Sequence, residues 1–513
     1  LQGDSIIDKR IRHVFLPALV VVTIAAGNAN ADDEIFRIIE LAHAGRVITA
    51  DLADLDGDGR KDLMLVTFDG LPPNQFRTIH VHRQLQAGGF ATTPAVSVPL
   101  PASSAVYDFA DVLASPGEEL LLLRPDSLTI LSLATPDGLR QEWPLDGPTT
   151  LGVADDERGL ERFPLLYTEF GEDPWILVPQ FGAISALSAD GELKVRLNVG
   201  GRANYFVSSG SEVISADSDF QVYYDAPKVS VGDINGDGHA DILSATRHEL
   251  RVFLRGADGM FASNPSYSVP LGLIGDADYK RGTGSVVTSA RDIDADGRLD
   301  LMISQIEGSM VSTTTTTRIY FNRGSGWDLT TPDDEFFSEG SVTSNLLVNT
   351  DRDDALELVR IEVRFSVLDL VELLLTREFD ARIEIHRLQD DGRFGEKPWS
   401  RKKIGTKVSF DTFRPRGFMP RADLDLNADG MMDFISSANG DRIEVFLGGE
   451  EGPFGKRTAV QDIPTAGVIH VEDANNDGMD DFVLYDPQTE GGTVRIGINL
   501  GALPGSPQND PDR

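Results

Sequence analysis

The chain has 513 residues, enough for several small domains or one large repeat fold, and it contains no cysteine. Its formal net charge is −36, from 82 acidic and 46 basic residues. Contact with nucleic-acid phosphates needs a basic face, so this charge argues against a nucleic-acid partner. Because no disulfide can form, we expect the stability of the fold to come from its core and from bound metal.

The N-terminal segment has the pattern of a secretory signal peptide. Lys9, Arg10 and Arg12 precede an apolar run from Val14 to Ala26, and Ala29-Asn30-Ala31 supplies the small residues of a cleavage site. The apolar run is shorter than the roughly 20 residues of a membrane-spanning helix. We therefore expect a signal peptide at 1–31, a mature chain that is secreted, periplasmic or on the cell surface, and no transmembrane segment in it.

A ten-residue pattern rich in aspartate first appears at 54–63 and recurs from residues 233, 292, 425 and 473. Each copy has Asp or Asn at positions 1, 3, 5 and 9 of a short loop and Gly at position 6. Hard cations such as calcium bind about six to eight oxygen ligands. A Gly at the sixth position permits the left-handed turn that brings such ligands together.

The candidate calcium ligands are the side chains at positions 1, 3, 5 and 9 and the backbone carbonyl at position 7. In the five copies these residues are Asp54, Asp56, Asp58, Arg60 and Asp62; Asp233, Asn235, Asp237, His239 and Asp241; Asp292, Asp294, Asp296, Arg298 and Asp300; Asp425, Asn427, Asp429, Met431 and Asp433; Asp473, Asn475, Asp477, Met479 and Asp481. An EF-hand is excluded because position 12 is never a glutamate. A strand-like run follows position 9 instead, so we expect five calcium loops that each join two strands.

The remaining repeats are weaker. A degenerate copy at 349–357 has Asp354 in place of the glycine, a copy at 111–119 keeps only its ends, and a unit at 163–198 has no such loop. Units of about four short strands at this spacing predict an all-β fold, a β-propeller of four-stranded blades. We count eight blades, with seven as the alternative, and expect residues 34–41 to close the ring. The domains are then a single propeller at 32–500 and a disordered tail at 501–513.

The loop with its following Leu, Ile or Phe strand resembles the calcium motif of FG-GAP and VCBS repeat proteins, which include the propeller head of integrin α subunits. The resemblance covers about residues 36–500. It implies a calcium-binding propeller whose ligand face lies opposite the calcium loops.

Three segments depart from the repeat. Residues 366–378 predict a helical insertion, with a long apolar strand as the alternative, and residues 200–228 are rich in Tyr and Phe. Both fall on connections at the face away from the calcium loops, where Tyr205, Tyr223 and Tyr224 are candidate ligand-binding residues; ordinary connecting loops are the alternative. The basic stretch 393–416 is expected to be a solvated outer edge, and a docking site is its alternative.

Catalytic motifs are missing from the sequence. It has no thiol, no Gly-x-Ser-x-Gly elbow and no His-Glu-x-x-His helix. His80 and His82 share a strand face without a third ligand. We therefore expect a recognition or adhesion module for an extracellular protein or glycan rather than an enzyme. The alternatives are a calcium-dependent polysaccharide-degrading enzyme, which a central cluster of Asp, Arg and aromatic residues would favour, and a scaffold subunit of an envelope complex.

Overall fold

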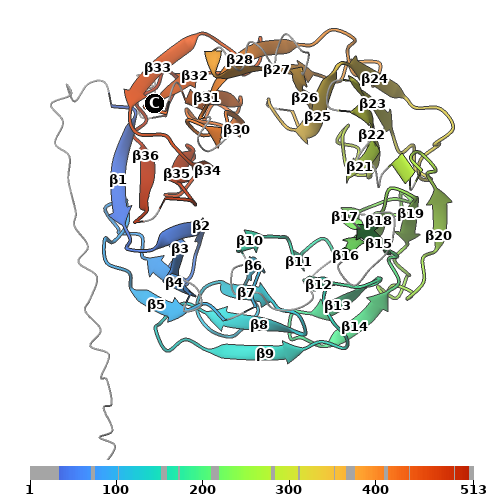
Figure 1. Cartoon of the computed structure of the whole chain (residues 1–513), viewed down its shortest axis with the longest axis horizontal. Helices are drawn as coiled ribbons and strands as arrows, with labels where there is room; N and C mark the ends of the chain where they lie inside the picture. Colours follow the sequence, from blue (N-terminus) through green and yellow to red (C-terminus); the bar gives the residue numbers. More distant parts are fainter. Residues whose placement is uncertain are drawn as a thin grey trace, which may run out of the picture.

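The fold is a closed ring of eight β-sheets around a central opening (Figure 1), as the computed structural model shows. The structure describes residues 34–507 apart from 71–74, 102, 152–158, 171–173, 209–218, 276, 279–283, 310–311, 352, 365–375, 410–413, 438–439 and 490. The expected signal peptide at 1–31 lies outside these residues. The prediction of an all-β propeller with eight blades is confirmed, and the alternative of seven is wrong.

Blades 1 to 4 follow one another along the chain, and each is an antiparallel sheet that starts from the centre of the ring. Their strands are β2 (Arg46–Ala53), β3 (Asp62–Asp69), β4 (Phe76–His82) and β5 (Val96–Pro99); β6 (Val106–Ala110), β7 (Glu119–Leu123), β8 (Ser127–Ser132) and β9 (Arg140–Pro144); β11 (Leu166–Tyr167), β12 (Trp175–Gln180), β13 (Ala183–Ser188) and β14 (Leu193–Leu197); β17 (Lys228–Gly232), β18 (Asp241–Ala245), β19 (Glu249–Phe253) and β20 (Tyr267–Pro270). β10 (Glu161–Arg162) adds to blade 2 by pairing in parallel with β6.

Blades 5 to 8 complete the ring in the same way. Their strands are β21 (Gly284–Arg291), β22 (Asp300–Ser309), β23 (Ser312–Tyr320) and β24 (Asp334–Glu339); β25 (Ser341–Val348), β26 (Glu357–Arg364), β27 (Glu378–His386), β28 (Ser400–Ser409) and β29 (Arg414–Pro415); β30 (Arg421–Leu424), β31 (Asp433–Ser437), β32 (Arg442–Phe446) and β33 (Arg457–Asp462); β34 (Val468–Glu472), β35 (Asp481–Tyr485), β36 (Thr493–Asn499) and β1 (Phe36–Ala42).

The second strands of the first two blades are buried along almost their whole length. All five residues of β7 are buried, and so are the first seven of β3. Neighbouring blades cover both faces of such a strand, so its residues need not alternate between polar and apolar. The outer strand β9 alternates between exposed and half-buried residues, because one of its faces meets water.

Ring closure joins the two ends of the propeller. β1 pairs with β36 in antiparallel register from Phe36 opposite Asn499 to Ala42 opposite Thr493, which confirms the expected closing strand. The packed chain continues past β36 into the region expected to be a tail. Leu503 is only 2% exposed and belongs to the apolar cluster of blades 7 and 8.

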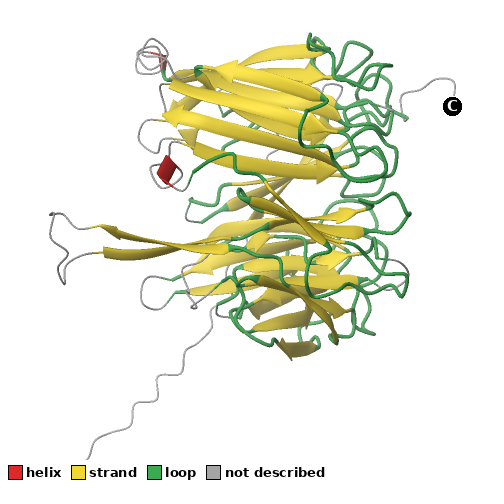
Figure 2. Ribbon diagram, turned by 90° about the vertical axis from the view of Figure 1, so that its right-hand side faces the viewer, coloured by secondary structure: helices red, strands yellow, loops and turns green. Residues whose placement is uncertain are grey.

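Two insertions leave the blades. β15 (Arg202–Ser208) and β16 (Asp219–Asp225) form a two-stranded antiparallel ribbon between blades 3 and 4. In the side view of Figure 2 a ribbon of two strands projects from one face of the ring, while most loops gather on the other. The helix expected at 366–378 falls largely on 365–375, outside the described residues, and β27 already begins at Glu378. Over the part of the chain that is described, no helix is long and apolar enough to cross a membrane.

Candidate metal centres

The five aspartate loops lie on the same face of the propeller, because each joins the first strand of a blade to the second. The loop 54–61 follows β2, and the loops of blades 4, 5, 7 and 8 follow β17, β21, β30 and β34. The ribbon β15–β16 lies on a blade-to-blade connection and therefore at the opposite face, as expected from the sequence.

The carboxylate at position 1 is held by the backbone of its own loop. In the loop of blade 4, Asp233 accepts the N–H of Gly236 at 2.7 Å on Oδ1 and that of Gly238 at 2.7 Å on Oδ2. In each of the other four loops, the backbone N–H of the glycine at position 6 likewise donates to the carboxylate of the aspartate at position 1. The glycine at position 6 is left-handed in all five, with φ between +80° and +86°. These hydrogen bonds within the loop hold its curled conformation.

Position 4 is a second left-handed position that the sequence reasoning missed. Two of the loops have glycine there, but Ala295, Ala428 and Asn476 adopt φ of 55–59°. A left-handed alanine is strained, which shows that the surrounding bonds fix the loop conformation. The glycines at position 4 of the loops in blades 1 and 4 were the available signal.

Position 5 orients the peptide at position 7. In each loop the backbone N–H of position 7 donates to Oδ1 of the position 5 aspartate at 2.8–3.0 Å. The residues held in this way are Arg60, His239, Arg298, Met431 and Met479. Their side chains vary because only the backbone takes part, and the use of their carbonyl oxygens as ligands stays a prediction.

In three of the five loops, position 3 supplies an oxygen atom that has no protein partner. Oδ1 of Asp56, of Asp294 and of Asn427 is buried and makes no hydrogen bond. A buried acceptor left without a partner costs about 1–3 kcal/mol. In the two other loops Oδ1 of Asn235 and of Asn475 accepts the N–H of position 5 instead.

Position 9 is the most buried of the candidate ligands, and it is tied into the blade. Asp300 accepts the N–H of Ile293 at 2.9 Å and that of Asn322 at 2.7 Å, and it is 0% exposed. Burial raises the pKa of Asp300, Asp433 and Asp481 to about 7. These carboxylates brace the loop against the end of the third strand, and a cation nearby would stabilise their charged form.

The carboxylates converge closely enough to share one ion. One oxygen from each of Asp292, Asp294 and Asp300 lies within 4.8 Å of the others, and the same holds for Asp54, Asp56 and Asp58. Together with the unpartnered oxygens at position 3, this donor set of carboxylates and carbonyls suits a hard cation such as calcium. The residues therefore fit the ion that the sequence pattern implies.

Arginine side chains pair with the acidic residues of the degenerate loop and of the first loop. In the degenerate copy, Arg387 pairs with Asp351 and lies 3.5 Å from an oxygen of Asp353, while Asp354 does not adopt the left-handed conformation. Arg83 occupies the equivalent place in blade 1, where it pairs with Asp62 and lies 3.2 Å from Asp56. Both arginines follow a histidine at the end of the third strand, a signal that the sequence reasoning did not use.

The loops also connect neighbouring blades. The side-chain amides of Gln84, Asn322 and Asn499 each donate to the carbonyl of position 2 in the loop of the preceding blade, at Ala474, Ile234 and Leu426. In blades 7 and 8 the backbone N–H of Asp425 donates to Asp480 at 2.7 Å. The conformation of each loop is thus coupled to an interface between blades, which the sequence did not reveal.

Of the three tyrosines proposed as ligand-binding residues, only Tyr224 has a side chain in the described part of the structure. Tyr224 lies at the base of the ribbon, where its hydroxyl accepts the N–H of Gly182 at 2.6 Å and donates to the carbonyl of Gly200. The backbone register pairs Tyr205 with Val222 and Tyr223 with Asn204. Tyr224 therefore anchors the ribbon, whereas the side chains of Tyr205 and Tyr223 lie outside the described part of the structure.

A polar cluster near the centre of the ring bears on the enzyme alternative. Asp51 accepts the hydroxyl of Tyr107 at 3.0 Å and the guanidinium of Arg162 at 3.1 Å, and His470 bonds Glu472 at 3.1 Å. These residues come from blades 8, 1 and 2, and Asp51 is 3% exposed. These hydrogen bonds brace three blades, and one ligand atom from each of Asp51, His470 and Glu472 lies within 4.8 Å of the others.

An eight-bladed propeller with acidic loops at one face is the class of protein that this geometry defines. Residues 233–303 and 425–484 match the model of the FG-GAP-like repeat family, and these two segments hold the loops of blades 4, 5, 7 and 8. The chain therefore carries two segments of FG-GAP-like repeat within an eight-bladed β-propeller.

Comparison with known proteins adds distant neighbours only. No curated protein matches the sequence. Solved structures with a similar fold include the V. cholerae biofilm matrix protein Bap1 (11% identity, 80% of this chain and 90% of that chain, TM-score 0.29). Others are the Dos1 propeller (8% identity, 91% and 96%, TM-score 0.35) and the S. cerevisiae core factor (8% identity, 91% and 62%, TM-score 0.32).

Proposed function

We propose that the protein is a secreted recognition module for an extracellular protein or glycan, and that calcium in about five loops holds its propeller rigid. The observation that carries the calcium part is the set of buried, unpartnered oxygens at Asp56, Asp294 and Asn427, each within a curled acidic loop. Calcium would satisfy these oxygens and offset the repulsion between carboxylates.

The role of calcium in this proposal is structural. Loop residues bond the neighbouring blade through Gln84, Asn322 and Asn499. An ion that fixes a loop would therefore also fix the interface beside it. The recognition surface would then lie elsewhere, and the ribbon β15–β16, which leaves the opposite face, supports this separation. The basic, apolar and small residues of 1–31 support secretion.

An array of immobilised glycans and extracellular proteins, probed with the mature chain, tests the recognition role. We expect capture of a defined set of spots in calcium. We also expect capture to persist when calcium is removed at a temperature where circular dichroism shows the chain still folded. Capture of nothing, or turnover of a polysaccharide by the same sample, would contradict the proposal.

The ribbon gives this experiment a matched pair of variants. Replacing Tyr205 and Tyr223 by Ala should abolish capture, whereas Asp137→Asn, an exposed carboxylate in a turn, should leave it unchanged. If the tyrosine variant still binds normally, the recognition surface lies on another part of the propeller.

A further inference from the structure

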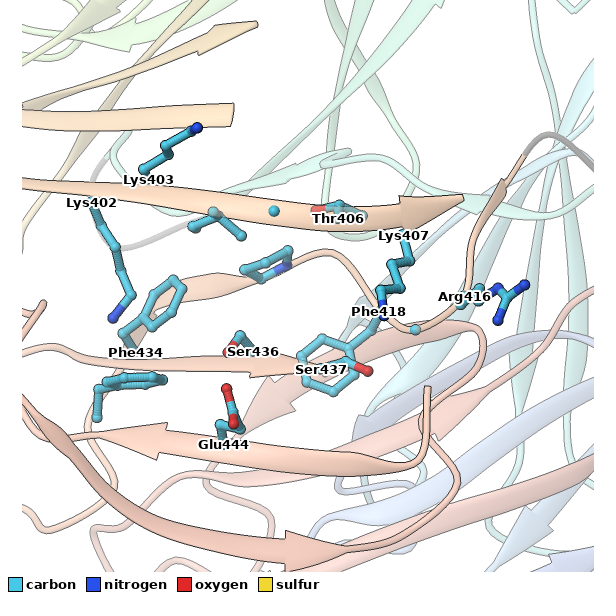
Figure 3. Close-up of a pocket in the computed structure, with 15 residues that line it drawn as sticks. Lys402, Lys403, Thr406, Lys407, Arg416, Phe418, Phe434, Ser436, Ser437 and Glu444 are labelled. Atoms are coloured by element: carbon cyan, nitrogen blue, oxygen red, sulfur yellow. The ribbon is translucent and has the colours of Figure 1, made fainter. Parts of the chain in front are cut away.

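A cationic groove lies between blades 6 and 7, at the stretch 393–416 where the sequence analysis expected a solvated edge. The outer strand β28 forms one wall, β31 and β32 form the other, and the segment at Gly417 and Phe418 closes one side (Figure 3). Its volume is about 190 Å³. The groove is smaller than the pockets of about 300–1,000 Å³ that enclose whole ligands, so it suits one unit of a larger ligand.

One end of the groove holds the ammonium group of Lys402, which contacts no carboxylate among the residues that the structure describes. Nζ of Lys402 lies 3.4 Å from the ring centroid of Phe446 and 4.7 Å from that of Phe434. The acid beside it, Glu444, accepts a hydrogen bond from Arg457 at 2.6 Å. The aromatic faces hold the positive charge in place.

The other end presents two exposed cations, Lys407 and Arg416 (Figure 3). Among the described residues, neither side chain has an acidic partner. Lys403 on the same strand differs, because it pairs with Asp380 at 2.5 Å. The chain has a net charge of −36, so acidic residues that could pair with these two cations are plentiful. Because the described acidic residues do not pair with them, the two cations are available to bind an external anion.

Hydroxyl groups lie between the two cationic ends. Thr406 from β28 and Ser436 from β31 line the groove, and their hydroxyls make no hydrogen bond within the described structure. A Cβ on Gly417 would lie 1.9 Å from Oγ of Ser437, which itself bonds Thr465. The absence of a side chain at Gly417 therefore lets its segment approach β31 closely.

We propose that this blade 6–7 groove binds a uronate unit of an acidic polysaccharide, with Lys407 and Arg416 on the carboxylate and Thr406 and Ser436 on ring hydroxyls. The inference rests on the proposed recognition function and names its substrate class. A carboxylate pairs well with guanidinium and ammonium donors. A sugar ring also brings several hydroxyls, which an acidic peptide side chain lacks, so the two free protein hydroxyls favour the glycan.

Isothermal titration calorimetry of the calcium-loaded mature chain tests this assignment. The probes are oligomers of galacturonate, guluronate and glucuronate, their carboxyl-reduced neutral counterparts, and a penta-glutamate peptide. We expect binding of a uronate oligomer that weakens as salt rises, and no binding of its neutral counterpart. The double variant Lys407→Ala/Arg416→Ala should weaken binding about a hundredfold, roughly tenfold for each charge-assisted hydrogen bond.

A matched control separates the site from net charge. Lys397→Ala/Lys456→Ala removes two exposed basic residues outside the groove and should leave affinity and melting temperature unchanged. Uronate binding that survives the groove variant, or that is abolished by chelator alone in folded protein, overturns the inference by placing the glycan elsewhere. Binding of penta-glutamate that the groove variant removes would assign the groove to an acidic protein instead. Capture of other partners without any uronate binding overturns this inference and leaves the recognition role standing.

Discussion

Replacing Asp294 by Asn should lower the melting temperature of the protein in calcium, but it should not lower it in chelator. Asp294 has a buried oxygen without a partner, and it lies within a group of three carboxylates. Burial and the neighbouring charges of Asp296 and Asp292 raise its pKa. In calcium the variant loses one charged ligand. In chelator the same change removes a repelling charge from a crowded loop and should leave the fold as stable as the wild type or more so.

The size of the change in melting temperature follows from the linkage between calcium binding and folding. One site saturated at 100 times its dissociation constant stabilises the folded state by about 2.7 kcal/mol. Unfolding entropy of roughly 2.1 cal/mol/K per residue gives about 1 kcal/mol/K for a ring of this length. The variant should therefore melt about 3 °C lower than the wild type in calcium. Emptying five such sites should lower the wild-type melt by about 13 °C on the same basis.

Differential scanning calorimetry in calcium and in excess chelator measures both effects. Asp137→Asn is the control, because it removes an exposed carboxylate from a turn between β8 and β9 and should shift neither melt. A destabilisation by Asp294→Asn that is equal in calcium and in chelator would refute the reasoning. The carboxylate would then act within the fold alone and not as a cation ligand.

The other predictions concern occupancy, acid stability and the ribbon. Metal content by mass spectrometry should approach five calcium ions per chain, with none in the 349–357 loop. Arg387→Gln should raise the calcium affinity of that loop if the guanidinium of Arg387 occupies the place of the ion. Burial lowers the pKa of His43 to about 3 and of His80 to about 4. Below pH 6.5 these histidines therefore take up protons in the unfolded chain but not in the folded one. The free energy of unfolding should then decrease by about 1.4 kcal/mol for each histidine with every unit by which the pH falls. A His43→Gln/His80→Gln variant should lose less stability between pH 7 and pH 5 than the wild type, and equal losses would contradict this. Tyr224→Phe should cost about 1–2 kcal/mol in a denaturant melt, because it removes the hydroxyl that bonds Gly182 and Gly200, and an unchanged melt would show that these bonds are not needed.

Features that depend on neighbours along the chain could be predicted from the sequence. The curl of each calcium loop is built from bonds between positions 1 and 6 or 5 and 7, which lie within ten residues of one another. The second strands were recognisable as short apolar runs, and their repetition gave eight blades and the closing strand β1. Local hydrogen bonding and burial on both faces leave these signatures in any single repeat.

Features that depend on the ring were decided by the tertiary structure. Arg387 reaches Asp351 from the end of the third strand, and Asn322 bonds Ile234 in the preceding blade, across 88 positions of the sequence. The hydroxyl of Tyr224 anchors the ribbon because it bonds Gly182, 42 positions away in the sequence. The blade 6–7 groove combines Lys407 with Ser436 only because adjacent blades pack face to face. Such contacts depend on the angle between blades, which no local pattern of residues encodes.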